Sequence, residues 1–194
     1  MHRPNEVLPR RSPGNPPSRS KSKPDFRAPY PGHTLFQDCF FVCDVKGVAG
    51  AGNLGKIFVQ LVVDSNSGLA FAKVYPTESP MDAIDILESH VLPYFKRFGA
   101  PVERIVTPAR RGFADRPLEY ALEIFLSASR IDHLHMDLTS ESHSRSCDQF
   151  YRFLAREFFA PALRRNYHQS FAKLQQELDV FVEAYNHLPE GNAR

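Results

Sequence analysis

Hydrophobic residues in the first half of this chain form short, nearly continuous runs. Residues 35–45 and 57–64 are rich in branched and aromatic residues, and residues 69–75 continue the pattern after a Ser-Asn-Ser-Gly turn at 65–68. Runs of this kind, bounded by turn residues, predict β-strands. We therefore expect an antiparallel meander of three strands, with a glycine-rich connector at residues 46–56 between the first two.

The spacing of apolar residues then changes to that of a helix. Ser79 suits an N-cap and Pro80 suits the first helical position, whereas Gly99 and Pro101 are typical of a helix end. Between these signals, five apolar residues recur on one predicted helical face: Ile84, Leu87, Val91, Phe95 and Phe98. The pattern predicts a helix that packs against the meander.

The second half of the chain alternates between strand and helix patterns. Residues 102–107 and 131–138 predict short strands, and residues 118–129 predict a helix between them. Two further helices follow, one around Cys147 and the last one capped by Ser170. The order βββαβαβαα implies one mixed sheet with helices on its faces.

Composition fits one globular domain of 194 residues, with 42% hydrophobic and 24% charged residues. No apolar run approaches the roughly 20 residues that a membrane span needs, and the N-terminus lacks the apolar core of a signal peptide. Three cysteines without a Cys-x-x-Cys pair argue against a disulfide framework and a four-ligand zinc site. We expect a cytoplasmic protein with no membrane partner.

Charge is distributed unevenly along the chain. Residues 1–30 hold seven basic and two acidic residues, a net charge of +5, so the remainder carries −3 from 17 basic and 20 acidic residues. The same segment is rich in Pro and Ser, which predicts a disordered basic arm at 1–33 and a folded domain at 34–190. A basic arm suits binding to a polyanion such as DNA. A solubilising tail, or the remnant of a lost upstream domain, fits it equally well.

Local motifs along the predicted domain resemble those of one protein family. They are Phe36-Gln37-Asp38, Lys46-Gly47-Val48, Val62-Val63-Asp64-Ser65-Asn66-Ser67, Leu69-Ala70-Phe71-Ala72-Lys73-Val74-Tyr75, Val91-Leu92-Pro93, Ile131-Asp132-His133 and Tyr185-Asn186-His187-Leu188-Pro189. In this order and spacing the chain resembles the integrase catalytic core and the DDE transposases, above all the integrase-core transposases of bacterial insertion sequences. The resemblance implies an α/β, ribonuclease-H-like fold. Its mixed five-stranded sheet has three antiparallel strands and then two parallel strands, flanked by helices.

The chemistry implied by this resemblance uses two Mg²⁺ or Mn²⁺ ions held by three acidic side chains. Asp38 matches the first acid, and Asp148 falls at the third, with Asp in place of the usual Glu. The second acid normally follows a threonine at the end of the fourth strand, where this chain has Thr107 followed by Pro108. Asp38 and Asp148 are therefore the candidate catalytic and metal-binding residues of a degenerate site, for which we expect no cofactor.

Other acids and other interpretations stay open at this point. Asp44, Asp64 and Asp115 are the alternative acids for the missing position. A second interpretation takes Asp38 as a structural buried acid, and Asp148 as an acid that stabilises the helix dipole and pairs with Arg152. The histidines at 133, 135 and 143 match no zinc template, and we interpret them as strand or loop residues.

The function favoured by these observations is DNA binding related to integration and transposition, by a protein that is catalytically inactive. The candidate phosphate-contacting residues are Arg10, Arg11, Arg19, Lys21, Lys23, Lys46, Arg110, Arg111, Arg145 and Arg152. One alternative is an active Mg-dependent DDE transposase or integrase that joins DNA ends. Another is a non-catalytic interaction subunit. Expected partners are DNA and either a second copy of the chain or a related transposase. The interaction subunit would bind its active relative through the last two helices.

Overall fold

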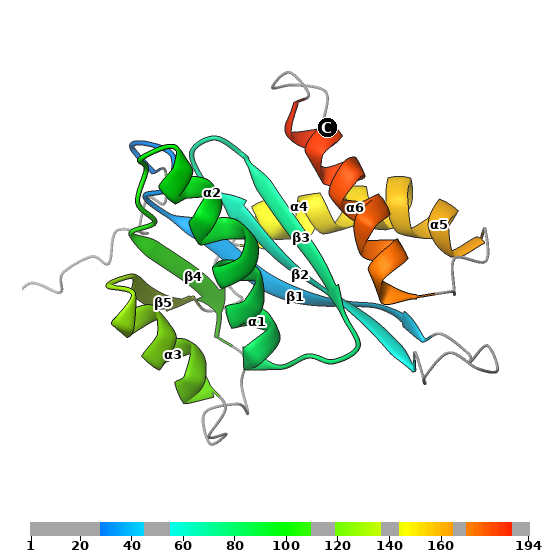
Figure 1. Ribbon diagram of the computed structural model, residues 1–194, viewed down its shortest axis with the longest axis horizontal. Helices are drawn as coiled ribbons and strands as arrows, with labels where there is room; N and C mark the ends of the chain where they lie inside the picture. The colour runs from blue at the N-terminus through cyan, green and yellow to red at the C-terminus, as the bar shows by residue number, and fades with distance from the viewer. Residues whose placement is uncertain (1–27, 45–54, 110–118, 137–143, 165–169, 188–194) are drawn as a thin grey trace, which may run out of the picture.

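A five-stranded mixed sheet forms the centre of the protein (Figure 1). The computed structural model describes residues 28–44, 55–109, 119–136, 144–164 and 170–187. The strand order is β3-β2-β1-β4-β5; β1, β2 and β3 are antiparallel, and β4 and β5 run parallel to β1. The strands are β1 Leu35–Asp44, β2 Lys56–Asp64, β3 Ala70–Tyr75, β4 Arg104–Pro108 and β5 Asp132–Met136. The predicted fold class is confirmed.

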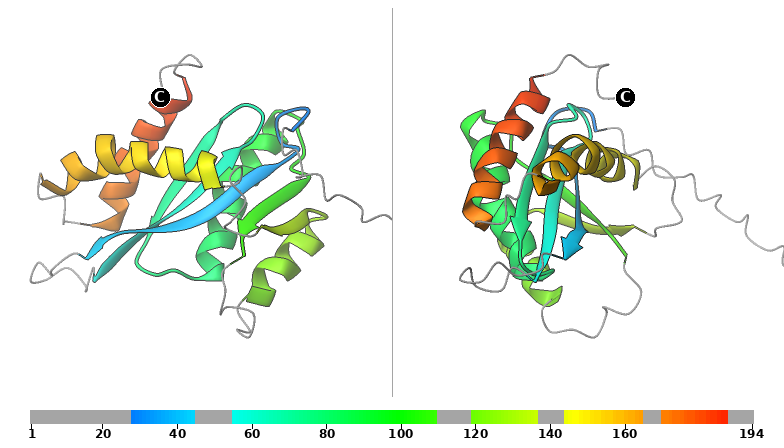
Figure 2. Two further views of the ribbon diagram at one scale, coloured as in Figure 1. Left: turned by 180° about the vertical axis from the view of Figure 1, so that it is seen from behind. Right: turned by 90° about the vertical axis from the view of Figure 1, so that its right-hand side faces the viewer.

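Helices cover both faces of this sheet (Figures 1 and 2). One face packs against α1 Pro80–Ile86, the π-helical turn η1 Leu87–Val91, α2 Leu92–Arg97 and α3 Glu119–Ala128. The other packs against α4 Ser144–Leu154, η2 Ala155–Phe159, α5 Ala160–Arg164 and α6 Phe171–Asn186. Each face has its own apolar core, because strand side chains alternate between the two. None of the helices among the described residues has the length and apolar character that a membrane crossing requires.

The first helix begins where the sequence predicted it. The Ser79 hydroxyl accepts from the Asp82 amide, and the Asp82 carboxylate accepts from the Ser79 amide, which together form a capping box. At the far end one expectation was wrong: Phe98, placed on the inward stripe, is 64% exposed. The reason is local, because Phe98 is the C-cap of α2 and the chain then turns away at Gly99, where φ is +67°.

The entry to β1 depends on a close approach between two backbone segments. Gly32 has φ +89°, and a Cβ atom there would lie 2.8 Å from the Pro101 carbonyl oxygen. The Gly32 amide donates to Asp64 Oδ1 at 3.0 Å, and the Gly32 carbonyl accepts from the Glu103 amide at 3.0 Å. Only glycine combines this conformation with this proximity.

The outer edge of β3 is covered by carboxamide side chains of α6. Asn186 Oδ1 accepts from the Ala70 amide at 2.9 Å, and Asn186 Nδ2 donates to the Ala70 carbonyl at 2.8 Å. Gln175 repeats the arrangement, accepting from the Val74 amide and donating to the Ala72 carbonyl. Both side chains take the place of a neighbouring strand, so that the backbone groups at this edge are satisfied.

Candidate functional site

Asp38 lies in the middle of β1, opposite Leu61 of β2, and is half-buried. Its neighbours along the strand, Phe36 and Phe40, both pack in the core beneath α4, and Phe40 stacks on Tyr151 at 4.4 Å between ring centroids. Because alternate residues of a strand share a face, Asp38 also points to the α4 side. Asp38 Oδ1 accepts from the Cys39 amide at 2.7 Å.

Pro108 is the last residue of β4. In the parallel β1–β4 pair, Leu35 is level with Ile105 and Phe36 with Val106, and the pairing ends there. Continued by two residues beyond the last pair, the same register relates Asp38 to Pro108. Phe36 and Val106 belong to the core beneath α4, so Asp38 and Pro108 are directed to that face as well. Pro108 therefore offers no side-chain oxygen for a metal ion at the end of β4.

Asp148 reaches the same region from α4. The buried thiol of Cys147 donates to the Phe36 carbonyl at 3.5 Å, which fixes the start of α4 against β1. Burial raises the pKa of this thiol well above its ordinary value, and the nearby charges of Asp38 and Asp148 raise it further. The structure thus brings both candidate acids into the surroundings of one thiol, although they are 110 residues apart in sequence.

Neither of the two alternative acids within the described residues, Asp64 and Asp44, is placed to replace the missing carboxylate. Asp64 is 1% exposed; its Oδ1 accepts from the Gly32 amide, and its Oδ2 accepts from the amide and the hydroxyl of Ser67. It therefore holds the turn between β2 and β3. Asp44 lies at the far end of β1, opposite Lys56, beyond a register shift after Phe41. Asp115 lies outside the described residues.

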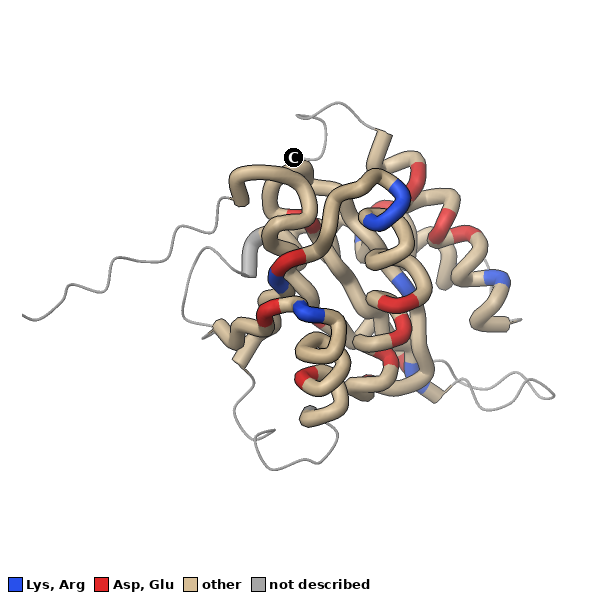
Figure 3. The backbone as a smooth tube through the Cα atoms, turned by 60° about the vertical axis from the view of Figure 1, so that its left-hand side comes forward, with Lys and Arg blue, Asp and Glu red and all other residues tan. Residues whose placement is uncertain are grey.

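Most of the candidate DNA-contacting residues also fall outside the described part. Arg145 and Arg152 are the exceptions, both on α4; Arg152 is exposed, one turn after Asp148. The described residues hold 11 Lys or Arg and 16 Asp or Glu, a net charge of −5, so the remaining residues must carry +7 (13 basic, 6 acidic). In Figure 3 the acidic positions recur along the described helices, with basic ones between them. The positive charge of the chain is concentrated in segments outside this body.

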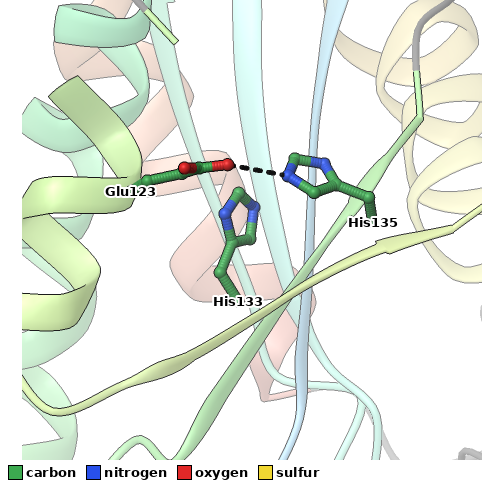
Figure 4. Close-up of side chains that lie close together, drawn as sticks. All are labelled: Glu123, His133 and His135. Atoms are coloured by element: carbon green, nitrogen blue, oxygen red, sulfur yellow. Dashed lines mark hydrogen bonds and ion pairs between the residues drawn. The ribbon is translucent and has the colours of Figure 1, made fainter. Parts of the chain in front are cut away.

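A second group of side chains, which sequence reasoning did not assemble, lies on the opposite face of the sheet. Glu123 of α3 and His133 and His135 of β5 each direct a potential ligand atom to one place, and these three atoms lie within 4.8 Å of one another (Figure 4). Within the described segments, no other three His, Cys, Asp or Glu residues meet this way. His135 Nε2 is 3.3 Å from Glu123 Oε1, and the histidine rings are 4.2 Å apart between centroids.

Thr107 lies beneath this group. Its Oγ1 is 2.9 Å from His133 Nε2 and 3.3 Å from His135 Nδ1. Burial is the main reason that the pKa of His133 falls to about 4, and the neighbouring His135 acts in the same direction. The His133 ring is therefore neutral at pH 7. The two histidines were interpreted as strand residues, which is confirmed; their His-x-His spacing was the available signal that they share a face.

Comparisons with known proteins identify the architecture. No protein-family model matches the sequence, and neither does any curated protein. A chain of the simian T-cell lymphotropic virus intasome in complex with PP2A regulatory subunit B56 gamma aligns with 84% of this chain at 18% identity and a TM-score of 0.60. The catalytic core domain of BIV integrase aligns with 82% of it, and with 87% of its own length, at 15% identity and a TM-score of 0.54. The chain has the fold of a retroviral integrase catalytic core.

One of these matches is to a longer chain. The present chain spans 51% of the intasome chain that it matches. The HTLV-2 integrase catalytic core domain, solved in complex with magnesium in a dimeric form, aligns at 16% identity with a TM-score of 0.49, covering 78% of this chain and 84% of its own. What is common to the integrase cores and this protein is the arrangement of strands and helices.

Proposed function

We propose that this protein is an integrase-core-like DNA-binding protein of a DNA integration or transposition system, and that it does not catalyse strand transfer. The observation that carries the proposal is that β4, which pairs in parallel with the strand of Asp38, ends at Pro108. In an integrase core, the end of the fourth strand is where the second metal-binding acid is expected. Here that position carries a pyrrolidine ring.

The electrostatic consequence follows from the needs of the two-metal reaction. Paired divalent ions require several carboxylate oxygens, both as ligands and as compensating charge. Asp38 and Asp148 supply two carboxylates, and Asp64 is committed to the β2–β3 turn. Loss of one metal ligand should lower the rate at least as much as loss of one oxyanion donor, by about 10²–10³-fold. If the site were active, Mg²⁺ or Mn²⁺ would bind to Asp38 and Asp148.

DNA binding is proposed from the distribution of charge. The described body has a net charge of −5, so it would repel phosphate unless contact were made through its basic segments. Those segments contain eight of the candidate contacts: Arg10, Arg11, Arg19, Lys21, Lys23, Lys46, Arg110 and Arg111. The ninth, Arg145, belongs to the first turn of α4. Arg152 extends the set further along α4. Such contacts bind the DNA backbone and do not read its sequence.

The test compares the wild-type protein with Pro108→Asp and with the double variant Pro108→Asp, Asp38→Asn. Each is incubated with duplex DNA ends and Mg²⁺ or Mn²⁺, and Mn²⁺ binding is measured separately by electron paramagnetic resonance. We expect no metal-dependent nicking or strand transfer by the wild type. Mn²⁺ affinity should rise at least about 10-fold in Pro108→Asp, and the gain should disappear in the double variant.

Two results would change the assignment. Wild-type strand transfer that is abolished by Asp38→Asn would establish the alternative of an active DDE transposase or integrase. Absence of binding to DNA at low salt would leave the non-catalytic interaction subunit. Light scattering, alone and with a related transposase, would then show whether the chain forms homo-oligomers or hetero-oligomers.

A further inference from the structure

The cluster of Glu123, His133 and His135 has the donor set of a transition-metal site. Two imidazoles and one carboxylate are ligands typical of zinc, with bond lengths of about 2.0–2.2 Å. Two ligands of a tetrahedral ion at that distance are about 3.3–3.5 Å apart. The His135 Nε2–Glu123 Oε1 separation of 3.3 Å already meets this value. The third ligand atom lies within 4.8 Å of the other two.

Thr107 fixes which nitrogen of each ring is available. Its hydroxyl oxygen lies beside Nε2 of His133 and Nδ1 of His135, and its two lone pairs can accept a hydrogen bond from each N–H. This leaves a lone pair on Nδ1 of His133 and on Nε2 of His135. The first of these atoms is buried and has no hydrogen-bond partner in the described part of the chain, and the second faces Glu123. In metal sites generally, a hydrogen bond to the ring nitrogen that does not bind the metal orients the histidine in the same manner.

The cluster is separate from the degenerate acid site. Thr107 and Pro108 are consecutive in β4, so their side chains point to opposite faces of the sheet. His133 and His135 are level with Ile105 and Thr107, on the face covered by α1 and α3. Asp38, Pro108 and Asp148 are on the face covered by α4. An ion bound at one site would not be a ligand of the other, because the sheet lies between them.

The ligand chemistry also distinguishes the ions. Mg²⁺ prefers oxygen ligands in an octahedral array, whereas imidazole nitrogens favour zinc and its neighbours in the first transition series. Glu123 and His135 are half exposed, with 50% and 52% of their side chains accessible, so a fourth position beside them is open to water. Without a metal, His135 and Glu123 form only a solvent-exposed side-chain pair, and such pairs contribute little to the free energy of unfolding.

We propose that Glu123, His133 and His135 bind one divalent transition-metal ion of the zinc type, with water at the fourth position. The ion links α3 to β5, the edge strand of the sheet. Thr107 is a positioning residue, since it acts through the two histidines. This site is independent of the proposed DNA-binding function and of Mg²⁺ chemistry.

The test uses the untagged full chain after treatment with a chelator. Isothermal titration with ZnCl₂ should show one site, and CoCl₂ should give the visible absorption bands of four-coordinate cobalt. Glu123→Gln and His135→Gln should each weaken Zn²⁺ binding by at least about 10-fold. They should also abolish the rise in melting temperature that Zn²⁺ causes in the wild type. Glu123 is exposed on α3, so its variant should fold normally.

Thr107 is tested with a matched pair of variants. Thr107→Val removes the acceptor with little change of shape and should weaken Zn²⁺ binding about 10-fold, whereas Thr107→Ser keeps the hydroxyl and should retain the affinity. His90→Gln and Asp38→Asn serve as controls and should bind Zn²⁺ as the wild type does. Failure of the wild type to bind Zn²⁺ or Co²⁺ would overturn the proposal. So would unchanged Zn²⁺ affinity in His135→Gln, or loss of the site in Asp38→Asn.

Discussion

The carboxamide of Asn186 pairs with both backbone polar groups of Ala70, at 2.9 Å and 2.8 Å. It occupies the outer edge of β3, where another strand would otherwise add. Ala70 is fully buried, so its amide and carbonyl have no access to water as a replacement partner. The asparagine of the Tyr-Asn motif thus acts on the sheet itself, and together with Gln175 it attaches α6 to the edge strand.

Asn186→Ala should destabilise the fold by about 1–3 kcal/mol, because it leaves two buried backbone groups unsatisfied. Chemical denaturation of the variant and the wild type measures the difference. Gln176→Ala, at an exposed position of the same helix, is the control and should change the free energy of unfolding by less than about 0.5 kcal/mol. Equal effects at the two positions would mean that the pairing with Ala70 does not stabilise the edge.

Gly32→Ala should also destabilise the protein, for two separable reasons. Its φ of +89° is unfavourable for alanine, at a cost of about 1–3 kcal/mol, and the new Cβ would lie 2.8 Å from the Pro101 carbonyl oxygen. Gly68 has a similar φ of +70° with nothing within 4 Å of a Cβ, so Gly68→Ala carries the conformational cost alone. Thermal unfolding should show a clearly larger loss for Gly32→Ala. A loss no larger than that of Gly68→Ala would refute the steric argument.

His90 should make the protein less stable as the solution becomes acidic. Burial, and then the charge of Lys73, lower the pKa of His90 below its ordinary value of 6.5, although Asp179 and Asp85 oppose this. The unfolded chain therefore takes up the proton first as pH falls. The stability that neutral His90 contributes is complete above pH 6.5 and is lost progressively below it.

Urea denaturation at several values between about pH 7.5 and about pH 5 tests this dependence, because that range spans the ordinary titration of histidine. The wild type should lose more stability across the range than His90→Gln, in which the titrating group is absent. His187→Gln, at an exposed histidine, controls for the removal of a histidine as such. Parallel pH profiles for the wild type and His90→Gln would show that His90 does not contribute.

The proposed DNA binding should depend steeply on salt and on the N-terminal basic residues. Residues 1–27 carry seven basic and two acidic side chains, and their deletion keeps Ala28, whose carbonyl accepts from Asn66 Nδ2. At about 0.9 per phosphate contact, deletion of 1–27 should lower the slope of log affinity against log salt by several units. Fluorescence anisotropy with labelled duplex DNA measures this slope.

Single arginines refine the same experiment. Arg152→Ala, on α4, should reduce the slope by about one unit, uniformly across DNA sequences. Arg97→Ala, at the exposed end of α2, should leave it unchanged. A slope unaffected by removal of residues 1–27 would exclude the arm as the phosphate-binding segment.

Local patterns were sufficient to predict most elements of this fold. The switch from continuous apolar runs to helical spacing located the three-strand meander and the helix that begins at Ser79, because strand and helix periods depend on neighbouring residues alone. The same reasoning failed at Phe98, where the turn at Gly99 removes an apolar side chain from the face that its spacing predicted. Helical periodicity says nothing about the residue at which a helix ends.

The candidate sites divide differently between sequence and structure. Sequence alone pointed to Asp38, Pro108 and Asp148 as a candidate site and to a net charge of −3 for residues 31–194, since each follows from residue type and order. Only the tertiary structure paired the strand of Asp38 with the strand of Pro108, committed Asp64 to a turn and gathered Glu123 with two histidines. Those relationships depend on strand register and on the packing of α3 over the edge of the sheet. Such contacts join segments that are distant in the chain, so they are set by the packing of the whole domain and not by any short stretch of sequence.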